Sequence, residues 1–301
     1  MSTYVCQLVR RLATTIAAAT TVAVVACSAP AERPMEPAAQ TAPRDATTRP
    51  SVAPVAGDPV WHYEADEGPS RWGALSPKFR ACSEGRAQSP IDLADATPVE
   101  AAATLKMRFP AAKLQIAHHE HVADGINNGH TIQVNYAGGD TLTMGGQAYG
   151  LVQYHFHNPS EHTLKGRHFP MEMHMVHTSA GGRLAVVGVL IEQGAHNHAF
   201  DPIWNNLPTQ KGLETHYPHV NVDVDDLLPS SRTSYRYEGS LTTPPCTEGV
   251  QWIVMTMPIQ LSADQIRAFT AIIHDNFRPT QPLNGRPVVT EPVVLASTTL
   301  P

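Results

Sequence analysis

The chain has 301 residues, with 21 Lys and Arg against 27 Asp and Glu, which gives a formal net charge of -6 at pH 7. It contains no run of basic residues, so neither its charge nor its pattern favours nucleic acid as a partner. Aromatic residues and runs of Val, Ile and Leu begin near Asp58 and continue to the end of the chain. That length suffices for one large domain with a single core.

The N-terminal segment predicts export. Two arginines precede an apolar, alanine-rich run that is too short for a membrane span and ends at small residues, as in a secretory signal peptide. The tetrapeptide VVAC at 24–27 resembles the bacterial lipobox, so we predict a lipoprotein signal peptide over residues 1–26 and acylation of Cys27. A plain signal peptide with an incidental cysteine is the alternative. We expect a periplasmic protein whose only contact with a membrane is this lipid anchor, and Ser28 favours the outer membrane.

Residues 27–58 are rich in Pro, Ala and Thr and contain almost no large apolar side chain. Such a segment buries too little surface to order itself, so it predicts a semi-extended tether. The change in composition that follows places the globular domain at residues 59–301.

Two cysteines lie in this domain, Cys82 and Cys246. In an oxidising compartment, a pair far apart in sequence is expected to be bonded. We therefore predict a disulfide, with two separate buried thiols as the alternative. On the chain-entropy account, closing so long a loop stabilises the fold by about 4 to 5 kcal/mol.

Strand-length segments that alternate or run apolar, bounded by Gly, Pro or Asn, dominate the domain. In chain order they are 113–119, 130–137, 142–157, 171–178, 183–193, 234–243 and 251–260. The best helical pattern spans 262–277 and begins with Ser262 as a candidate N-cap. The sequence therefore predicts a mainly β domain with short helices on its surface.

The chain contains 16 His, so strand geometry must decide which of them could bind a metal. Successive side chains on a strand point to opposite faces, which puts His155 and His157 on one face. The same parity puts Glu172 and His174 together on the polar face of the next strand. If the two strands pair, His174 joins the first two rings, with a carboxylate beside it.

The other His residues lack such a frame. His119 and His121 precede a Gly- and Asn-rich stretch, and His196 and His198 lie in a turn after a strand, where nothing nearby supplies a third ligand on a rigid frame. We interpret both pairs as surface loops. We assign no metal-binding role to the remaining histidines near the predicted strands, which are His162, His168 and His177.

Three imidazoles on rigid strands, with a fourth position left open, are typical of a catalytic zinc site rather than a structural one. Other enzyme classes lack their motifs here. The paired His-x-Glu and Pro-Cys-x-x-Cys of zinc deaminases are absent, as are the His-Glu-x-x-His helix of metalloproteases and the Gly-x-Ser-x-Gly elbow of serine hydrolases.

These residues resemble the α-class carbonic anhydrases, and eight segments match the family in its order across the domain. The segments are WHYEADEGPSRWGAL, QSPIDL, NNGHTIQVNY, QYHFHNPSEHT, MEMHMVH, LAVVGVLIEQG, GSLTTPPCTEGVQWIV and NFRPTQPLNGRPV. The pattern is closest to the bacterial branch. The resemblance implies a single-domain α+β fold with a large central, mostly antiparallel twisted β-sheet and short surface helices.

The resemblance also implies roles for individual residues. His155, His157 and His174 would bind one zinc ion per chain. Three groups would orient these rings: the side chains of Gln153 and Glu172 and the backbone of Asn276.

The family pattern places the chemistry on three further residues. Thr242 would pass its proton to Glu161 and accept a hydrogen bond from a zinc-bound hydroxide. His130 would shuttle the product proton to solvent.

Two walls of the active site follow from the same match. The CO2 pocket would be lined by Val176, Val186, Leu241, Thr243 and Trp252, although buried apolar residues on strands are core residues by default. Tyr63, Asn128 and Gln133 would order water between the zinc ion and His130.

The activity that the resemblance implies is reversible hydration of CO2 to bicarbonate and a proton. Sulfonamides and small anions would inhibit it, and the bacterial relatives suggest a possible homodimer. The alternative is a binding or adhesion module with the same fold and no hydration activity. Such modules usually lack a zinc ligand, whereas this chain keeps all three.

Overall fold

The computed structural model describes residues 47–50, 60–98, 105–109, 112–119, 131–136 and 142–295. All of them belong to one unit, Ala42–Pro301. The predicted signal peptide at 1–26, Cys27, most of the tether, Asn128 and His130 lie outside the described residues. Within the described part of the chain, no helix is long and apolar enough to cross a membrane.

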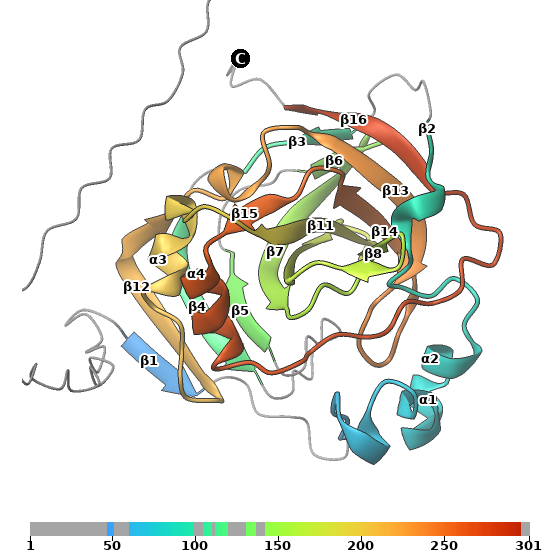
Figure 1. The fold of residues 1–301 in the computed structure, drawn as a ribbon, viewed down its shortest axis with the longest axis horizontal. Coiled ribbons are helices and arrows are strands. Elements are labelled where there is room, and N and C mark those ends of the chain that lie inside the picture. The colour runs from blue at the N-terminus through green and yellow to red at the C-terminus, as the bar shows by residue number, and fades with distance from the viewer. Residues whose placement is uncertain are drawn as a thin grey trace, which may run out of the picture. The chain divides into compact units, whose positions relative to one another are not determined.

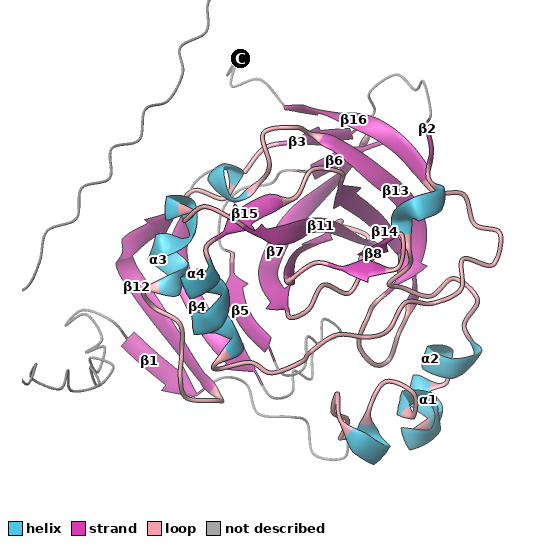
Figure 2. Cartoon of the chain, viewed as in Figure 1, coloured by secondary structure: helices cyan, strands magenta, loops and turns pink. Residues whose placement is uncertain are grey.

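Most of the described chain forms one 14-stranded sheet, which Figure 2 shows as the bulk of the fold. In spatial order its main path is β1 (Thr47–Pro50), β12 (Leu213–Val222), β4 (Ala112–His119), β5 (Thr131–Asn135), β7 (Gln147–His157), β10 (Met171–Thr178), β11 (Leu184–Gln193), β14 (Glu248–Met255), β13 (Thr233–Ser240), β16 (Val289–Leu295), β3 (Leu105–Met107) and β6 (Leu142–Met144). Off this path, β15 (Ile259–Leu261) pairs with β11, and β2 (Thr97–Pro98) pairs with β16. A separate two-stranded sheet joins β8 (Thr163–Leu164) to β9 (Arg167–His168).

The sheet closes on itself and is mixed. Strand β6 also pairs with β7, so the strands from β7 through β11, β13 and β16 back to β6 form a closed, barrel-like ring (Figure 1). Parallel pairs join β11 to β14 and β15, and β16 to β2 and β3. The expectation of a mostly antiparallel sheet is therefore corrected. Alternation along one strand reports its faces, whereas a parallel partner far away in sequence leaves no local signal.

The helices are short. The α-helices are α1 (Trp72–Leu75), α2 (Ala81–Glu84), α3 (Asp201–Trp204) and α4 (Ala263–Thr270), and the 3₁₀ helices are η1 (Ala65–Glu67), η2 (Pro77–Phe79), η3 (Leu93–Asp95), η4 (His198–Phe200) and η5 (Asp225–Leu227). Helix α4 begins at the predicted N-cap, since Ser262 and Gln265 form a capping box. It ends at Thr270, well before residue 277. The residues that follow reach the end of β7, where Asn276 N donates to the oxygen of Asn158, the residue after the strand, at 3.0 Å.

Two large clusters of buried apolar side chains divide strand β10 between them. Met171, Met173 and Met175 belong to the larger core, whereas Val176 belongs to the smaller cluster with Trp252. This division follows the period of two expected for a strand buried on both faces. The residues between the methionines therefore face the second cluster, which is where the polar groups of β10 gather.

Cys82 and Cys246 form the predicted disulfide, which links α2 to the loop between β13 and β14. It packs in a third apolar cluster with Trp61, Trp72 and Phe79. This bond ties the N-terminal part of the described domain to a loop 164 residues away.

Strand β1 lies within the predicted tether. Its residues Thr47–Pro50 pair antiparallel with β12, from Leu213 to His216. Without β1, that edge of β12 would leave its backbone groups without a strand partner, and an edge of this kind accepts a further strand. Four residues of the segment predicted as a semi-extended tether are therefore extended and paired with the sheet.

His177 is a buried titratable group of β10. Its Nδ1 lies 2.8 Å from Met175 O, and its side chain is fully buried. Burial lowers the pKa of His177 from 6.5 to about 4, although hydrogen bonds with the backbone of Met175 and Ala185 oppose this shift. Between these two values the unfolded chain binds a proton that the folded protein does not bind, so stability falls as the pH drops through this window.

We predict that His177→Gln makes the protein less sensitive to acid. The free energy of unfolding of the wild type should fall between pH 6.5 and 4 by about 3 kcal/mol more than that of the variant. Urea unfolding of both proteins at several pH values tests this, because contributions common to both cancel in the difference. Parallel pH profiles would contradict the prediction, even if Gln lowers stability uniformly.

Candidate metal centre

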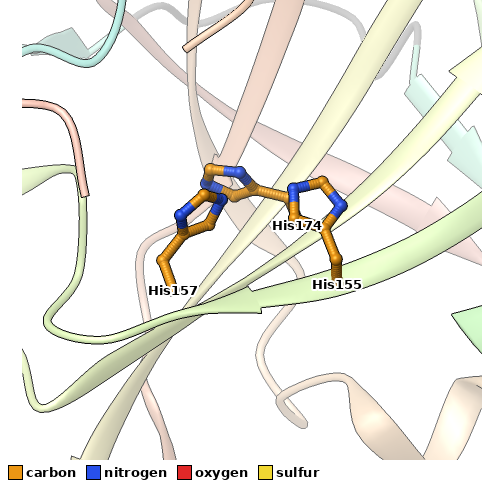
Figure 3. A group of neighbouring side chains, drawn as sticks. All are labelled: His155, His157 and His174. Carbon is orange, nitrogen blue, oxygen red and sulfur yellow. The ribbon is translucent and has the colours of Figure 1, made fainter. Parts of the chain in front are cut away.

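Strands β7 and β10 bring His155, His157 and His174 together. The strands pair antiparallel, with His174 opposite His155 and Glu172 opposite His157. The ring centroids of His157 and His174 are 4.5 Å apart, and those of His155 and His174 are 5.4 Å apart (Figure 3). One nitrogen of each ring lies within 4.8 Å of the others, and all three side chains are buried. This geometry comes from strand parity together with the register of the pair.

Oxygen acceptors orient the two imidazoles of β7. Nδ1 of His155 lies 2.9 Å from Gln153 Oε1, and Nδ1 of His157 lies 2.7 Å from the backbone oxygen of Asn276. Because a carbonyl oxygen can only accept, Nδ1 of each ring carries the proton and Nε2 keeps its lone pair. Nε2 is therefore the nitrogen of each ring that could bind a metal.

Asn276 is itself fixed to the end of β7. Its side-chain Nδ2 donates to Phe156 O at 2.9 Å, and its Oδ1 accepts from the Asn158 N–H at 2.7 Å. These bonds hold the Asn276 backbone oxygen in place against His157. The residue that orients this ring therefore comes from a segment 119 positions away in the sequence.

The buried Glu172 carboxylate orients His174 and accepts four hydrogen bonds. Oε1 lies 2.9 Å from His174 Nε2 and 2.7 Å from His162 Nδ1, and Oε2 accepts from the backbone N–H groups of Glu161 and His162 at 2.9 and 2.8 Å. Burial opposes ionisation of Glu172, but His162 and His174 outweigh it and hold the pKa of this carboxyl well below its usual range. The ionised carboxylate accepts from Nε2–H of His174, which leaves Nδ1 of that ring with its lone pair.

The structure gives His162 a positioning role that the sequence analysis did not predict. Its Nε2 lies 2.6 Å from the Tyr237 hydroxyl, which in turn lies 2.9 Å from Ser89 Oγ. Both ring nitrogens of His162 are therefore hydrogen-bonded, Nε2 to Tyr237 and Nδ1 to Glu172, which holds the carboxylate in place. His162 follows Glu161 in a short connection after β7, and no local spacing links that connection to a carboxylate on the next strand.

Zinc is the cofactor that the donor set implies, and the residues fit it. Among the described residues, the buried His157 Nε2 has no hydrogen-bond partner, and Glu161 Oε2 lies 3.6 Å from it. Burial lowers the pKa of His157 to about 4 despite its bond to Asn276, and burial also lowers the pKa of His174. Both rings are therefore neutral near pH 7, as metal binding requires.

Glu161 lies beside these rings with Thr242. Its Oε1 accepts from the Arg278 backbone N–H at 2.8 Å, and Oε2 lies 3.8 Å from His174 Nδ1. Burial raises the pKa of Glu161 to about 7, although His174, a hydrogen bond from Thr242 and the Arg278 N–H lower it. The hydrogen bond to this carboxyl consumes the only proton of the Thr242 hydroxyl.

The disulfide and a buried arginine hold the loop that carries Thr242. The carbonyl of Cys246 accepts from Gln88 Nε2 at 3.1 Å. The guanidinium of Arg278 donates to Gln88 Oε1 at 2.9 Å, to Ser89 O at 2.7 Å and to Cys82 O at 2.8 Å. The Arg278 side chain therefore supports the loop indirectly, through Gln88 and Cys82, and the Arg278 backbone holds Glu161.

The predicted apolar wall lies on strands next to the imidazoles. Val176 is opposite Val186, which is opposite Trp252, so the three form one cross-strand row. The Trp252 ring lies 4.8 Å from the His174 ring between centroids, and Leu241 belongs to the same buried cluster. Thr243, next in the Thr242 loop, is also buried.

The predicted polar wall is described in part. Gln133 lies opposite His155 on β5 and donates to Asn135 Oδ1 at 2.6 Å. Tyr63 packs edge-on against Trp61, and its phenol has a pKa raised well above its usual range, by burial and then by the Glu161 charge. The other two members of this wall, Asn128 and His130, lie outside the described residues.

The fold and site thus define a centre of three histidines on a closed, mixed β-sheet. The domain that carries it matches known proteins over most of its length. Residues 67–292 match the family described as eukaryotic-type carbonic anhydrase. A carbonic anhydrase of Klebsiella pneumoniae is 43% identical over 232 residues, covering 76% of this chain and 90% of that protein. A carbonic anhydrase of Pectobacterium carotovorum is 40% identical over 230 residues, again covering 76% of this chain and 90% of the relative.

A solved structure of the α-carbonic anhydrase of Thermovibrio ammonificans, in complex with the inhibitor sulfanilamide, superposes with a TM-score of 0.70 at 37% identity. The match covers 77% of this chain and all of that one. This chain therefore belongs to the α-class carbonic anhydrase family of enzymes.

Gly188 gives the Glu172 carboxylate the room it needs. It pairs with His174 across β10 and β11, and a Cβ at this position would lie 3.0 Å from Glu172 Oε1 and 3.3 Å from Val254 Cγ2. Any larger side chain must therefore push the carboxylate that orients His174.

We predict that Gly188→Ala lowers zinc affinity about 10-fold or more, because disturbing the partner of a ligating imidazole has effects of this size. Competition with a chromogenic chelator measures the change. Gly181→Ala is the matched control, since a Cβ there meets nothing closer than Ser179 Oγ at 3.9 Å. If a folded Gly188→Ala protein bound zinc as tightly as the control, the position of the Glu172 carboxylate would not depend on having glycine at position 188.

Proposed function

We propose that this chain catalyses the reversible hydration of CO2 to bicarbonate and a proton, with one zinc ion held by His155, His157 and His174. The observation that carries this proposal is the convergence of three buried imidazoles, each with its proton on the nitrogen that faces an oxygen acceptor. The remaining nitrogens are the donors that a three-His zinc site requires.

Zinc bound there would supply a hydroxide nucleophile near neutral pH, because it lowers the pKa of a bound water molecule to about 7, the value known for carbonic anhydrases. The protein's own part is to hold three neutral ligands in place. Gln153, Glu172 and the Asn276 backbone do so by fixing the proton on each ring.

Thr242 and Glu161 would set the direction of attack. Since the Thr242 hydroxyl spends its proton on Glu161, its oxygen can only accept a hydrogen bond from a nucleophile in the site. An acceptor at a fixed position selects the orientation in which a lone pair of that nucleophile faces the substrate carbon. Arg278 N–H holds the other carboxyl oxygen and keeps Glu161 in position.

The apolar row of Val176, Val186 and Trp252, with Leu241, would receive CO2. The substrate has no net dipole and gains little from hydrogen bonds, so an apolar wall beside the imidazoles favours it over water. Thr243 would lie at the edge of this pocket. Bicarbonate is charged and is better solvated by water than by the apolar wall, so it leaves the pocket.

Each turnover leaves a proton that must reach solvent. We propose His130 as the shuttle, since an imidazole titrates near neutral pH, and Tyr63, Asn128 and Gln133 as the side chains that order water on the way. Support for His130 and Asn128 comes from the sequence resemblance. For Gln133 it includes a place opposite His155 on the paired strand.

The N-terminal sequence supports a further set of proposals. Residues 1–26 would direct export, acylated Cys27 would anchor the chain to the cell envelope, and residues 27–58 would connect the anchor to a catalytic domain at 59–301. Inhibition by sulfonamides and small anions, and a homodimer, are proposed from the relatives. The binding-module alternative gains no support from this site, which retains the full ligand set.

The activity test is a stopped-flow CO2 hydration assay with a pH indicator on the zinc-loaded chain. We expect rapid hydration, and His174→Ala should lose more than about 100-fold in zinc affinity, because altering only the partner of a ligand already costs about 10- to 100-fold. Zinc content is measured alongside activity. A zinc-replete wild type without hydration would overturn the proposal and favour the binding module, and normal zinc in the variant would show that the third ligand is wrong.

The shuttle is tested with His130→Ala. We expect kcat to fall by about 100-fold, at the low end of general acid–base effects, whereas kcat/KM changes little because proton export follows the hydration step. Added imidazole buffer should restore part of kcat. If imidazole gave no recovery, another group would carry the proton.

A further inference from the structure

A second cluster of side chains that could bind a metal ion is exposed to solvent, unlike the buried centre. His196 Nε2 is 2.7 Å from Asp201 Oδ1, and His198 Nδ1 is 2.8 Å from Asp201 Oδ2. The two rings are 4.6 Å apart between centroids, and one ligand atom from each residue lies within 4.8 Å of the others. The cluster occupies the turn that leaves β11 and enters α3.

The turn is a fixed frame rather than a free loop. Asn197 N–H donates to Gln265 Oε1 at 3.0 Å, and Gln265 Nε2 donates back to Asn197 O at 2.9 Å. Ala195 N–H donates to Gln260 Oε1 at 3.2 Å. Gln265 is buried at the start of α4, so the backbone between the two histidines is held by the body of the domain.

The structure therefore corrects the sequence-based interpretation of His196 and His198 as a loop pair without a third ligand. A carboxylate, Asp201 at the start of α3, lies beside both rings, and the side chains of Gln265 in α4 and Gln260 in β15 hold the turn. Neither is visible in the local pattern His-x-His, because the glutamines that hold the turn lie more than 60 positions further along the chain.

We propose that His196, His198 and Asp201 form a second, solvent-exposed site for a divalent transition-metal ion of the zinc and copper class. Two imidazoles and one carboxylate are ligands that such ions prefer, and they leave further positions to water. The side chain of His198 is 85% exposed and that of His196 is 45% exposed, so an ion can reach them directly.

Binding requires only a shift of protons within the rings. In a neutral imidazole, the proton that now faces Asp201 can move to the other nitrogen, which frees the inner nitrogen as a donor. Asp201 is ionised for this purpose. Burial opposes its ionisation, but hydrogen bonds from His198 and His196 together outweigh burial and lower the pKa of Asp201 below its usual value. With each proton on the outer nitrogen, the ion would take the place of the two hydrogen bonds to Asp201 and tie the exit of β11 to α3.

The two sites differ in solvent exposure, which controls how fast a bound ion exchanges with ions in solution. The rings of the first are buried, whereas those of the second face water. We therefore expect the second ion to bind and leave freely while zinc stays in the buried centre. A bound ion should also raise the thermal unfolding temperature in a concentration-dependent way, because the three side chains are held together in this geometry in the folded chain.

Copper(II) is the probe that tests the site, since it lies at the top of the affinity series for imidazole ligands and its electron paramagnetic resonance spectrum reports the number of nitrogen donors. The zinc-loaded full chain, without an affinity tag, is titrated with Cu²⁺ while zinc content is followed. We expect one additional equivalent of copper, two-nitrogen superhyperfine structure and no loss of zinc.

Single substitutions test whether the additional copper binds at these three residues or elsewhere. His196→Gln and His198→Gln should each weaken copper binding at least 10-fold and reduce the spectrum to one nitrogen, and Asp201→Asn should weaken it while keeping both nitrogens. His62→Gln, which removes a partly exposed His beside Glu67, is the control and should bind as the wild type does. The proposal is wrong if the folded His196→Gln and His198→Gln proteins bind copper as the control does, or if the wild type takes up none beyond its zinc.

Discussion

A buried carboxylate on β10 is the group on which the centre depends. Glu172 is an ionised carboxylate held away from water. The free-energy cost of burying this charge is offset because four hydrogen-bond donors surround it. Two of those donors are backbone N–H groups of the connection after β7, so the same charge that orients His174 also fixes the loop that carries Glu161. Any change that displaces this carboxylate disturbs a ligand and the adjacent acid together, which is why the missing side chain at Gly188 matters.

The three imidazoles are oriented by three different kinds of acceptor. An amide on the same strand serves His155, a carboxylate two residues away serves His174, and a backbone carbonyl from the chain after α4 serves His157. All three acceptors do the same physical task, which is to place the ring proton away from the centre. Arg278, two residues after Asn276, then connects that segment to Glu161 and to Cys82, whose disulfide reaches the loop that carries Thr242.

The two histidine clusters show why burial and frame matter more than spacing. Both contain a His-x-His pair and a carboxylate. On β7, alternation turns both rings to one buried face. Water has little access to an ion bound there. At the end of β11, the rings are exposed and rest on Asp201, so any ion bound there competes with solvent and with the hydrogen bonds already present.

The sequence by itself determined the mainly β character of the domain, the Ser262 cap and the strand faces that carry His155, His157, His174 and Glu172, because alternation and capping are local patterns. The resemblance across eight segments identified the family. Only the tertiary structure decided the closed, mixed sheet, the early end of α4, the support of Glu172 by His162 and Tyr237, and the position of Asp201 beside His196 and His198. Each of these depends on hydrogen bonds or parallel strand pairs between segments distant in sequence, and their partners are chosen by packing of the whole domain rather than by neighbouring residues.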